Sequence, residues 1–277
     1  MLVAALLTAL ASGPLQSTLV KLEPVPFTQV TVTDRFWSPR RETNRKVSLA
    51  HSLDQLEKAG NIEDLELAAA GKRTGFKGLV FMDSDLYKTI EACAYSLATD
   101  PDPALEKRLD GVIAKIAAAQ MADGYLNTYY QINAPDKRFT NLAWNHELYC
   151  AGHLFEAAVA HHAATGKTSL LDVAKKFADL LCRTFGDGPG QRPGYCGHPE
   201  IELALVKLSK ATGNKEYFRL ARYYVETRGS KFFAKEQNVP LDKYEGEYYQ
   251  DNVPIRDHTA IVGHAVRAGY LLSLIHI

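Results

Sequence analysis

The chain has 277 residues, of which 46% are hydrophobic, and its 32 basic residues balance its 32 acidic ones. This apolar content is enough for one large packed domain or two small ones. A formal net charge of zero gives no electrostatic basis for binding nucleic acid or an anionic membrane, so we expect neither partner. A neutral or weakly charged ligand fits this composition better.

The N-terminus carries a short apolar run from Leu2 to Ala11, followed by the small and turn residues Ser12, Gly13 and Pro14. This pattern resembles the core of a signal peptide, although the usual positive flank is missing. The run is too short to span a membrane. We therefore expect residues 1–17 to be a signal peptide and the protein to be exported to the periplasm or the cell exterior. A frayed N-terminal helix is the alternative.

The first elements after this leader are predicted from local pattern. Apolar and polar residues alternate from Phe27 to Val32, which predicts a short strand. Pro39 favours a helix start, and Gly60 is the expected end of that helix. The polar, glycine-containing stretch 61–78 is predicted to be a long loop.

Two acidic residues open the next predicted helix, which runs through FMDSDLYKTIEACAYSLAT. Asp83 or Ser84 is expected to cap it. Capping explains at most one of the nearby acidic side chains, so Asp83 or Asp85 is a candidate ligand contact.

After a further helix that begins at Asp102-Pro103, the stretch 123–145 is rich in Tyr, Asn and Asp. Rings and amides together suit a sugar site; a surface loop with locally packed tyrosines is the alternative.

Three later helices are each expected to begin beside a histidine. His146 precedes the apolar stripe of the segment 145–165, His198 precedes IELALVKLSKAT, and His264 precedes AVRAGYLL. The first two helices end in Thr-Gly, at Gly166 and Gly213, which favours a left-handed terminal residue. An amphipathic helix follows each one, so the repeating unit is a helical hairpin. If alternate helices form an inner ring, their N-termini and the three histidines meet at one mouth.

The remaining motifs exclude several kinds of site. Cys93, Cys150, Cys182 and Cys196 show no CxxC spacing, so we expect buried free thiols and no zinc cluster made from them alone. A disulfide formed after export is the alternative. No segment has the pattern of a phosphate loop, a GxSxG elbow, an HExxH helix or a Rossmann turn.

Five motifs in order resemble successive blocks of glycoside hydrolase family 127: FMDSDLYKTIEACAY, AAQMADGYLNTYY, NHELYCAGHLFEAAVAHHAATGK, GHPEIELALVKLSKATG and GHAVRAGYLL. The resemblance extends over nearly everything from Phe27 to Leu271. It implies an exo-acting β-L-arabinofuranosidase that acts on plant-type glycans containing L-arabinofuranose. It also implies that residues 18–277 are the N-terminal part of an (α/α)6 toroid. We therefore predict an all-α, incomplete toroid of helical hairpins with a short N-terminal strand segment.

The resemblance implies that His146, His198 and His264 line the sugar pocket, with Asp83, Asp123 and Tyr125 nearby. In the family a glutamate acid/base and a cysteine nucleophile held on zinc lie after the GHAVRA motif. We therefore expect zinc in the complete protein and the catalytic residues beyond Ile277, and we assign no catalytic residue or metal ligand here. The C-terminal LSLIHI departs from the expected polar turn and matches the translation of a transposon-end adapter, which suggests a truncated fragment that is inactive alone.

Two other functions are compatible with the same helices. A sugar epimerase or unsaturated-uronide hydrolase would use the chain's own carboxyl groups and histidines, with candidates Asp83, Glu147, Glu200 and Glu202. A non-catalytic carbohydrate-binding or scaffold protein would keep sugar affinity without turnover.

Overall fold

The computed structural model describes residues 25–276 and is all-α over that range. The predicted signal peptide lies outside the described residues. The helices, in chain order, are α1 (Trp37–Thr43), α2 (Leu49–Ala59), α3 (Asn61–Ala69), α4 (Asp83–Thr99), α5 (Pro103–Ala119), α6 (Thr128–Asn133), α7 (Glu147–Thr165), α8 (Ser169–Thr184), α9 (Ile201–Thr212), α10 (Lys215–Thr227), α11 (Phe232–Glu236) and α12 (Ala265–His276). Short 3-10 turns lie at Phe27–Gln29, Pro135–Lys137, Glu247–Tyr249 and Ile255–Asp257, and a π-helical turn spans Asn44–Ser48.

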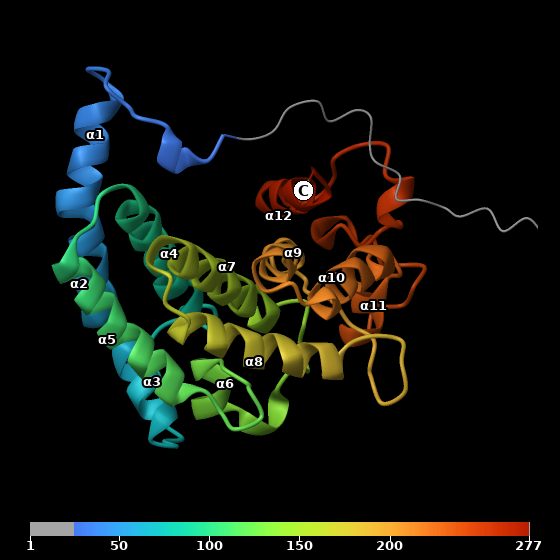
Figure 1. Ribbon diagram of the computed structural model, residues 1–277. Coiled ribbons are helices and arrows are strands. Elements are labelled where there is room, and N and C mark those ends of the chain that lie inside the picture. The colour runs from blue at the N-terminus through green and yellow to red at the C-terminus, as the bar shows by residue number, and fades with distance from the viewer. Residues whose placement is uncertain (1–24, 277) are drawn as a thin grey trace, which may run out of the picture.

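The helices form two curved rows. Helices α2, α4, α7, α9 and α12 contact one another in that order and make the inner row, whereas α3, α5, α8 and α10 make the outer row. Figure 1 shows α4, α7 and α9 side by side, with α5, α8 and α10 outside them. Each inner helix up to α9 is followed by an outer one, which confirms the predicted helical hairpins. Because inner helices alternate with outer ones, their N-termini point to the same end of the arc.

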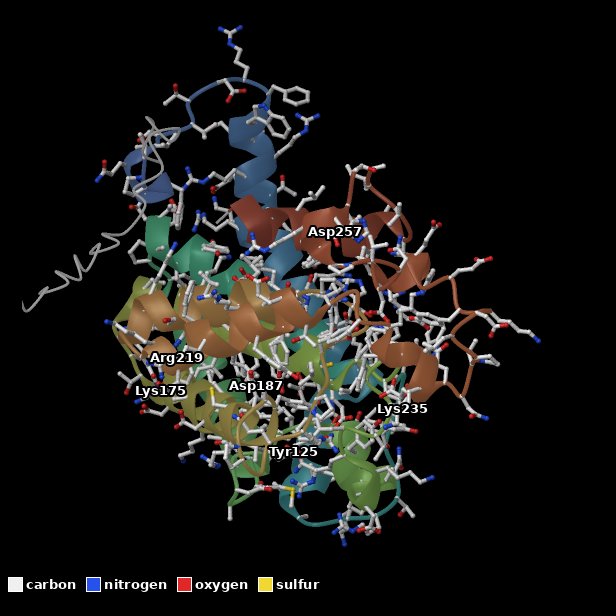
Figure 2. All side chains as sticks on the ribbon, turned by 90° about the vertical axis from the view of Figure 1, so that its right-hand side faces the viewer. Tyr125, Lys175, Asp187, Arg219, Lys235 and Asp257 are labelled. Carbon is white, nitrogen blue, oxygen red and sulfur yellow. The ribbon has the colours of Figure 1, made fainter. Side chains whose placement is uncertain are left out.

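The two rows differ in polarity as their positions require. Helix α7 lies between α4 and α9 and is buried along most of its length, including its polar residues Glu147, His153 and Glu156. Helices α8 and α10 bury one face and expose the other. Their exposed faces carry Lys175 and Arg219, labelled in Figure 2, which form ion pairs within their own helices. None of the described helices is long and apolar enough to cross a membrane.

The glycine helix ends lie where the sequence predicts them. Gly60, Gly166 and Gly213 follow α2, α7 and α9 in the left-handed region, with φ values of 100°, 72° and 73°. This conformation is strained for residues with a Cβ atom, so glycine terminates each helix at low cost.

Two predictions for the N-terminal part are wrong. The segment Phe27–Val32 is not a strand: Phe27–Gln29 form a 3-10 turn, and the described residues offer no neighbouring strand to pair with. The stretch predicted as a long loop begins with helix α3, Asn61–Ala69. Ile62 and Leu65 of α3 are buried, and its polar residues are compatible with a helix because this helix belongs to the outer row.

Candidate functional site

Three histidines meet at the N-terminal end of the inner row. His146 is the N-cap residue of α7, His198 lies in the loop before α9, and His264 immediately precedes α12. The ring centroids of His146 and His198 are 5.8 Å apart, and those of His198 and His264 are 6.4 Å apart. The structure thus brings together three of the six candidate residues, each from a different inner helix.

Tyrosine rings surround these histidines. Tyr149 and Tyr270 lie 4.6 and 5.3 Å from the ring of His198, measured between centroids. Tyr248 lies 5.5 Å from His264. The cluster therefore combines imidazole nitrogens with apolar ring faces, which is the composition that a sugar site needs.

The loops that carry His146 and His198 are fixed to each other. The Glu236 carboxylate accepts hydrogen bonds from the backbone N–H groups of Leu142 and Ala143, at 2.7 and 2.8 Å. The N–H of Gly197 donates to the carbonyl of Leu142 at 2.9 Å. A Cβ on Gly197 would come within 2.2 Å of the Ala143 carbonyl oxygen, so only glycine permits this approach. These contacts set the separation of the two histidines.

A buried arginine holds the other loops. Arg228 is fully buried and donates to the carbonyl oxygens of Cys196 and Tyr249, at 2.7 and 3.0 Å, and to the carboxylate of Glu202 at 2.8 Å. Cys196 lies two residues before His198, and Tyr249 follows Tyr248. One guanidinium group therefore links the two segments to the start of α9.

Burial keeps the central imidazoles neutral. Loss of hydration lowers the pKa of His198 to about 3, and Arg267 adds to this effect. Burial also lowers the pKa of His146. A neutral imidazole has one N–H donor and one acceptor nitrogen. Nδ1–H donates to the carbonyl oxygen of Trp144 in His146 and to that of Pro199 in His198, so Nε2 of each ring is left to accept from a hydroxyl group.

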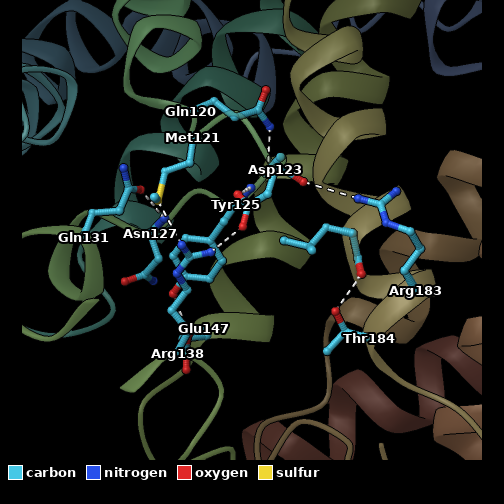
Figure 3. A network of polar contacts seen from close by, with 12 residues as sticks. Gln120, Met121, Asp123, Tyr125, Asn127, Gln131, Arg138, Glu147, Arg183 and Thr184 are labelled. Atoms are coloured by element: carbon cyan, nitrogen blue, oxygen red, sulfur yellow. Dashed lines mark hydrogen bonds and ion pairs between the residues drawn. The ribbon is translucent and has the colours of Figure 1, made fainter. Parts of the chain in front are cut away.

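Tyr125 and Asp123 belong to a different network, shown in Figure 3. The hydroxyl of Tyr125 and the N–H of Phe139 both donate to the Glu147 carboxylate. Burial raises the pKa of Glu147 to about 7, although these donors lower it. Burial opposes ionisation of Asp123, but its ion pair with Arg138 and the N–H of Tyr125 outweigh that effect and lower its pKa. Tyr125 is fully buried, so it supports the start of α7 from within the core.

Asp83 also has a structural partner. Its carboxylate accepts from the N–H of Thr128 at 2.8 Å and from the Thr128 hydroxyl at 2.5 Å. No side chain caps α4, whose N-cap residue is Met82, so the prediction that Asp83 or Ser84 caps this helix is wrong. Asp83 instead connects the start of α4 to the start of α6.

The tyrosine-rich stretch 123–145 is partly a core segment. Its two least exposed tyrosines, Tyr125 and Tyr130, are packed in the core.

Comparisons with known proteins agree with this architecture. Residues 29–274 match the family described as β-L-arabinofuranosidase, GH127 catalytic domain. The chain belongs to glycoside hydrolase family 127. A non-reducing end β-L-arabinofuranosidase from Bifidobacterium longum subsp. longum is 40% identical, over 88% of this chain and 42% of the relative.

Solved GH127 structures share the fold. A β-L-arabinofuranosidase from Geobacillus stearothermophilus T6 superposes with a TM-score of 0.84 at 43% identity, covering 89% of this chain and 41% of the other. The GH127 β-arabinofuranosidase BT3674 also gives 0.84, at 40% identity, covering 91% and 39%. These matches confirm the predicted all-α toroid and the family resemblance. The chain spans about two fifths of the length of these relatives.

The zinc ion implied by the GH127 resemblance does not fit the donors described. Cys93, Cys150, Cys182 and Cys196 are free thiols, and Cys93, Cys150 and Cys196 are buried. Within residues 25–276, no three His, Cys, Asp or Glu side chains are grouped so that they could hold a metal ion.

A separate hollow lies away from the three histidines. It has a volume of about 710 Å³ and lies against α9, α10 and the 3-10 turn Ile255–Asp257. Its wall is mainly apolar, from residues such as Val206 and Phe218, and the Glu226–Arg256 pair supplies its main charges. The histidine cluster brings imidazoles and aromatic rings together, whereas this hollow has no comparable set of uncharged polar groups.

Sequence reasoning missed several residues of the site. Tyr149 lies three residues after His146, so helical spacing could have identified it, whereas the separation of six residues between His264 and Tyr270 does not match that spacing. Trp144 lies outside the cluster and packs against Tyr248, which in turn contacts His264. Glu236 and Arg228 act from elements distant in sequence, and no local pattern marks them.

Proposed function

We propose that this chain forms the sugar-binding part of an exported, exo-acting β-L-arabinofuranosidase that acts on plant-type glycans. The family membership and the activity of the Bifidobacterium relative, a non-reducing end β-L-arabinofuranosidase, support this proposal. The observation that carries it is the convergence of His146, His198 and His264 from three inner helices. The apolar run Leu2–Ala11 supports export.

The proposed roles follow from the chemistry of the cluster. A furanose presents hydroxyl groups that can donate hydrogen bonds, and the Nε2 atoms of His146 and His198 can accept them, because Nδ1–H of each ring already donates to a backbone carbonyl oxygen. Tyr149 and Tyr270 would cover the C–H face of the sugar. We propose Asp83, Asp123 and Tyr125 as residues that support the pocket through the starts of α6 and α7.

We propose that hydrolysis needs the glutamate and the zinc-held cysteine that the resemblance places after the GHAVRA motif. This chain alone should therefore bind sugar without hydrolysing it. Its own carboxyl groups are poor substitutes: Glu202 is paired with Arg228, Asp83 with Thr128, and Glu147 with Tyr125. Glu200 is only 2% exposed. This geometry favours the glycosidase proposal over an epimerase or uronide hydrolase that uses those groups.

Sugar titration tests the proposal directly. We expect methyl β-L-arabinofuranoside to bind this chain saturably in calorimetry or ligand-observed NMR. His264→Ala should weaken binding at least tenfold, about 1.4 kcal/mol. His51→Ala, an exposed histidine on α2, is the matched control and should leave affinity unchanged. Absence of binding by the wild-type chain, or unchanged affinity in His264→Ala, would refute this function.

A further inference from the structure

Two large aromatic side chains stay exposed beside the histidine cluster. Trp144 is 48% exposed and Tyr248 is 42% exposed. Their ring centroids are 5.6 Å apart and their planes differ by 35°, so the two rings pack against each other as a partly exposed aromatic pair. Exposed aromatic area is costly in water, and adjacent aromatic residues beside a site often mark a ligand contact.

The loop that carries Trp144 is held rigidly. Its N–H donates to the side-chain oxygen of Asn141 at 3.1 Å, and its carbonyl oxygen accepts from the ring of His146. The preceding residue, Ala143, is held by Glu236. The indole is thus positioned by the same contacts that position His146, which limits the entropy lost when a ligand stacks on it.

The buried guanidinium group of Arg267 lies over the ring of Tyr248. Arg267 is 3% exposed, and its guanidinium carbon lies 4.2 Å from the centroid of the Tyr248 ring and 5.9 Å from that of Trp144. No carboxylate among the described residues lies within ion-pair distance of Arg267, and its Nε and Nη1 atoms have no hydrogen-bond partner there. Contact with the aromatic rings therefore contributes to the stabilisation of this cation and favours one position of the Tyr248 ring.

The aromatic pair adjoins the site in space as well as in sequence. Tyr248 lies 5.5 Å from His264 between ring centroids, and Trp144 is two residues before His146. A sugar held by the histidines would have its immediate neighbour in a glycan close to these rings. Aromatic faces stack on the C–H face of a sugar ring, and the indole N–H and the phenol O–H can meet its hydroxyl groups.

We propose that Trp144 and Tyr248 form a second sugar-binding subsite, which stacks on the sugar to which the terminal arabinofuranose is linked. The proposal rests on the proposed function, because the histidine site fixes the position of the terminal sugar. The subsite would make this protein select oligosaccharides over single sugars. Its ligand class is a neutral glycan of at least two sugar units.

The test compares two ligands that share the same terminal sugar: methyl β-L-arabinofuranoside and a β-linked L-arabinofuranose disaccharide. Calorimetric titration of the wild-type chain should show the disaccharide binding at least tenfold more tightly. Trp144→Ala should remove this advantage and leave the affinity for the methyl glycoside within twofold of wild type. Trp144→Phe should restore part of it. Phe218→Ala, which removes an aromatic residue 51% exposed on α10, is the control and should alter neither affinity.

The outcomes separate this subsite from the histidine site. If both sugars bind wild type and Trp144→Ala equally well, the exposed rings serve another partner and the subsite proposal is wrong. It is also wrong if both affinities fall by the same factor, because Trp144 then belongs to the terminal-sugar site. If neither sugar binds the wild-type chain, the proposed function fails, and the subsite fails with it.

Discussion

The Nδ1 atom of His153 lies 3.4 Å from Oε1 of Glu200, and both side chains are buried where α7 meets α9. No hydrogen-bond partner satisfies either carboxylate oxygen or either ring nitrogen. Burial raises the pKa of Glu200, and the nearby carboxyl groups of Glu156 and Glu91 raise it further. Burial lowers the pKa of His153 to about 3. Both groups are therefore neutral in the folded protein at pH values where the unfolded chain ionises Glu200.

This protonation state predicts that Glu200 makes stability fall as pH rises. In the unfolded chain Glu200 loses its proton near pH 4.5, whereas the folded protein retains it to higher pH. The folded state then binds more protons, so its stability declines from about pH 4.5 up to the folded pKa. Glu200→Gln removes this decline. We expect the variant to gain at least about 1 kcal/mol over wild type between pH 5 and pH 8, measured by urea unfolding. A stability difference that does not change with pH would contradict a protonated Glu200.

The contact that buries this pair depends on Gly152. A Cβ at this position would lie 2.7 Å from Cγ of Glu200 and 3.0 Å from the backbone of Ile201. Gly152→Ala should therefore push α7 and α9 apart and cost about 1–3 kcal/mol of unfolding free energy. Gly111→Ala on α5 is the matched control, because nothing lies within 4 Å of its added Cβ. The control should stabilise the chain by up to about 1 kcal/mol, since alanine favours helix. Equal thermal midpoints for Gly152→Ala and wild type would show that the helices can separate without cost.

Much of the inner row could be predicted from sequence because its signals are local. The apolar stripe after His146 and the Thr-Gly ends at Gly166 and Gly213 each lie within one helix, and the structure confirms the hairpins that they define. Wrong predictions arose where a local pattern had two outcomes. Alternation at Phe27–Val32 fits a strand only if a partner strand exists, and the described part of the chain has none. The acidic stretch after Gly60 fits a loop or an outer-row helix, and packing of Leu65 selects the helix.

The site was predicted less completely because it depends on contacts between distant segments. The three histidines at helix starts could be predicted from the sequence. Their separation in space depends on Glu236 and Arg228, which lie far from them in sequence. Asp83 and Tyr125 have residue types suited to sugar binding. Their partners, Thr128 and Glu147, became visible only in the folded arrangement.

Substitution of Gly166 measures how much the left-handed end of α7 contributes to the stability of the fold. It has φ of 72° at the end of α7, and nothing lies within 4 Å of an added Cβ. A substitution therefore introduces backbone strain without a steric clash. Gly166→Val should lower the free energy of unfolding by about 1–2 kcal/mol. Gly166→Asn should cost less, because asparagine tolerates the left-handed region. Thermal unfolding of both variants measures this order, and a Val variant as stable as wild type would refute the cap.

Arg228 should be the most sensitive position among the residues that hold the site. It is fully buried, and its removal leaves the Glu202 carboxylate buried without its cation. Arg228→Met is therefore expected to cost about 3–5 kcal/mol in denaturant unfolding. Arg219→Met, which removes an exposed partner of Glu216 on α10, should change stability by less than about 1 kcal/mol.

A double variant separates the lost charge pair from the lost loop contacts. Arg228→Met with Glu202→Met removes both buried charges, so it should recover much of the stability lost by Arg228→Met. The carbonyl groups of Cys196 and Tyr249 still lose their donor in this variant. We therefore expect sugar affinity to remain reduced even where stability returns, because His198 and Tyr248 lie beside those carbonyl groups. Full recovery of both stability and affinity would mean that Arg228 serves only as the counter-ion of Glu202.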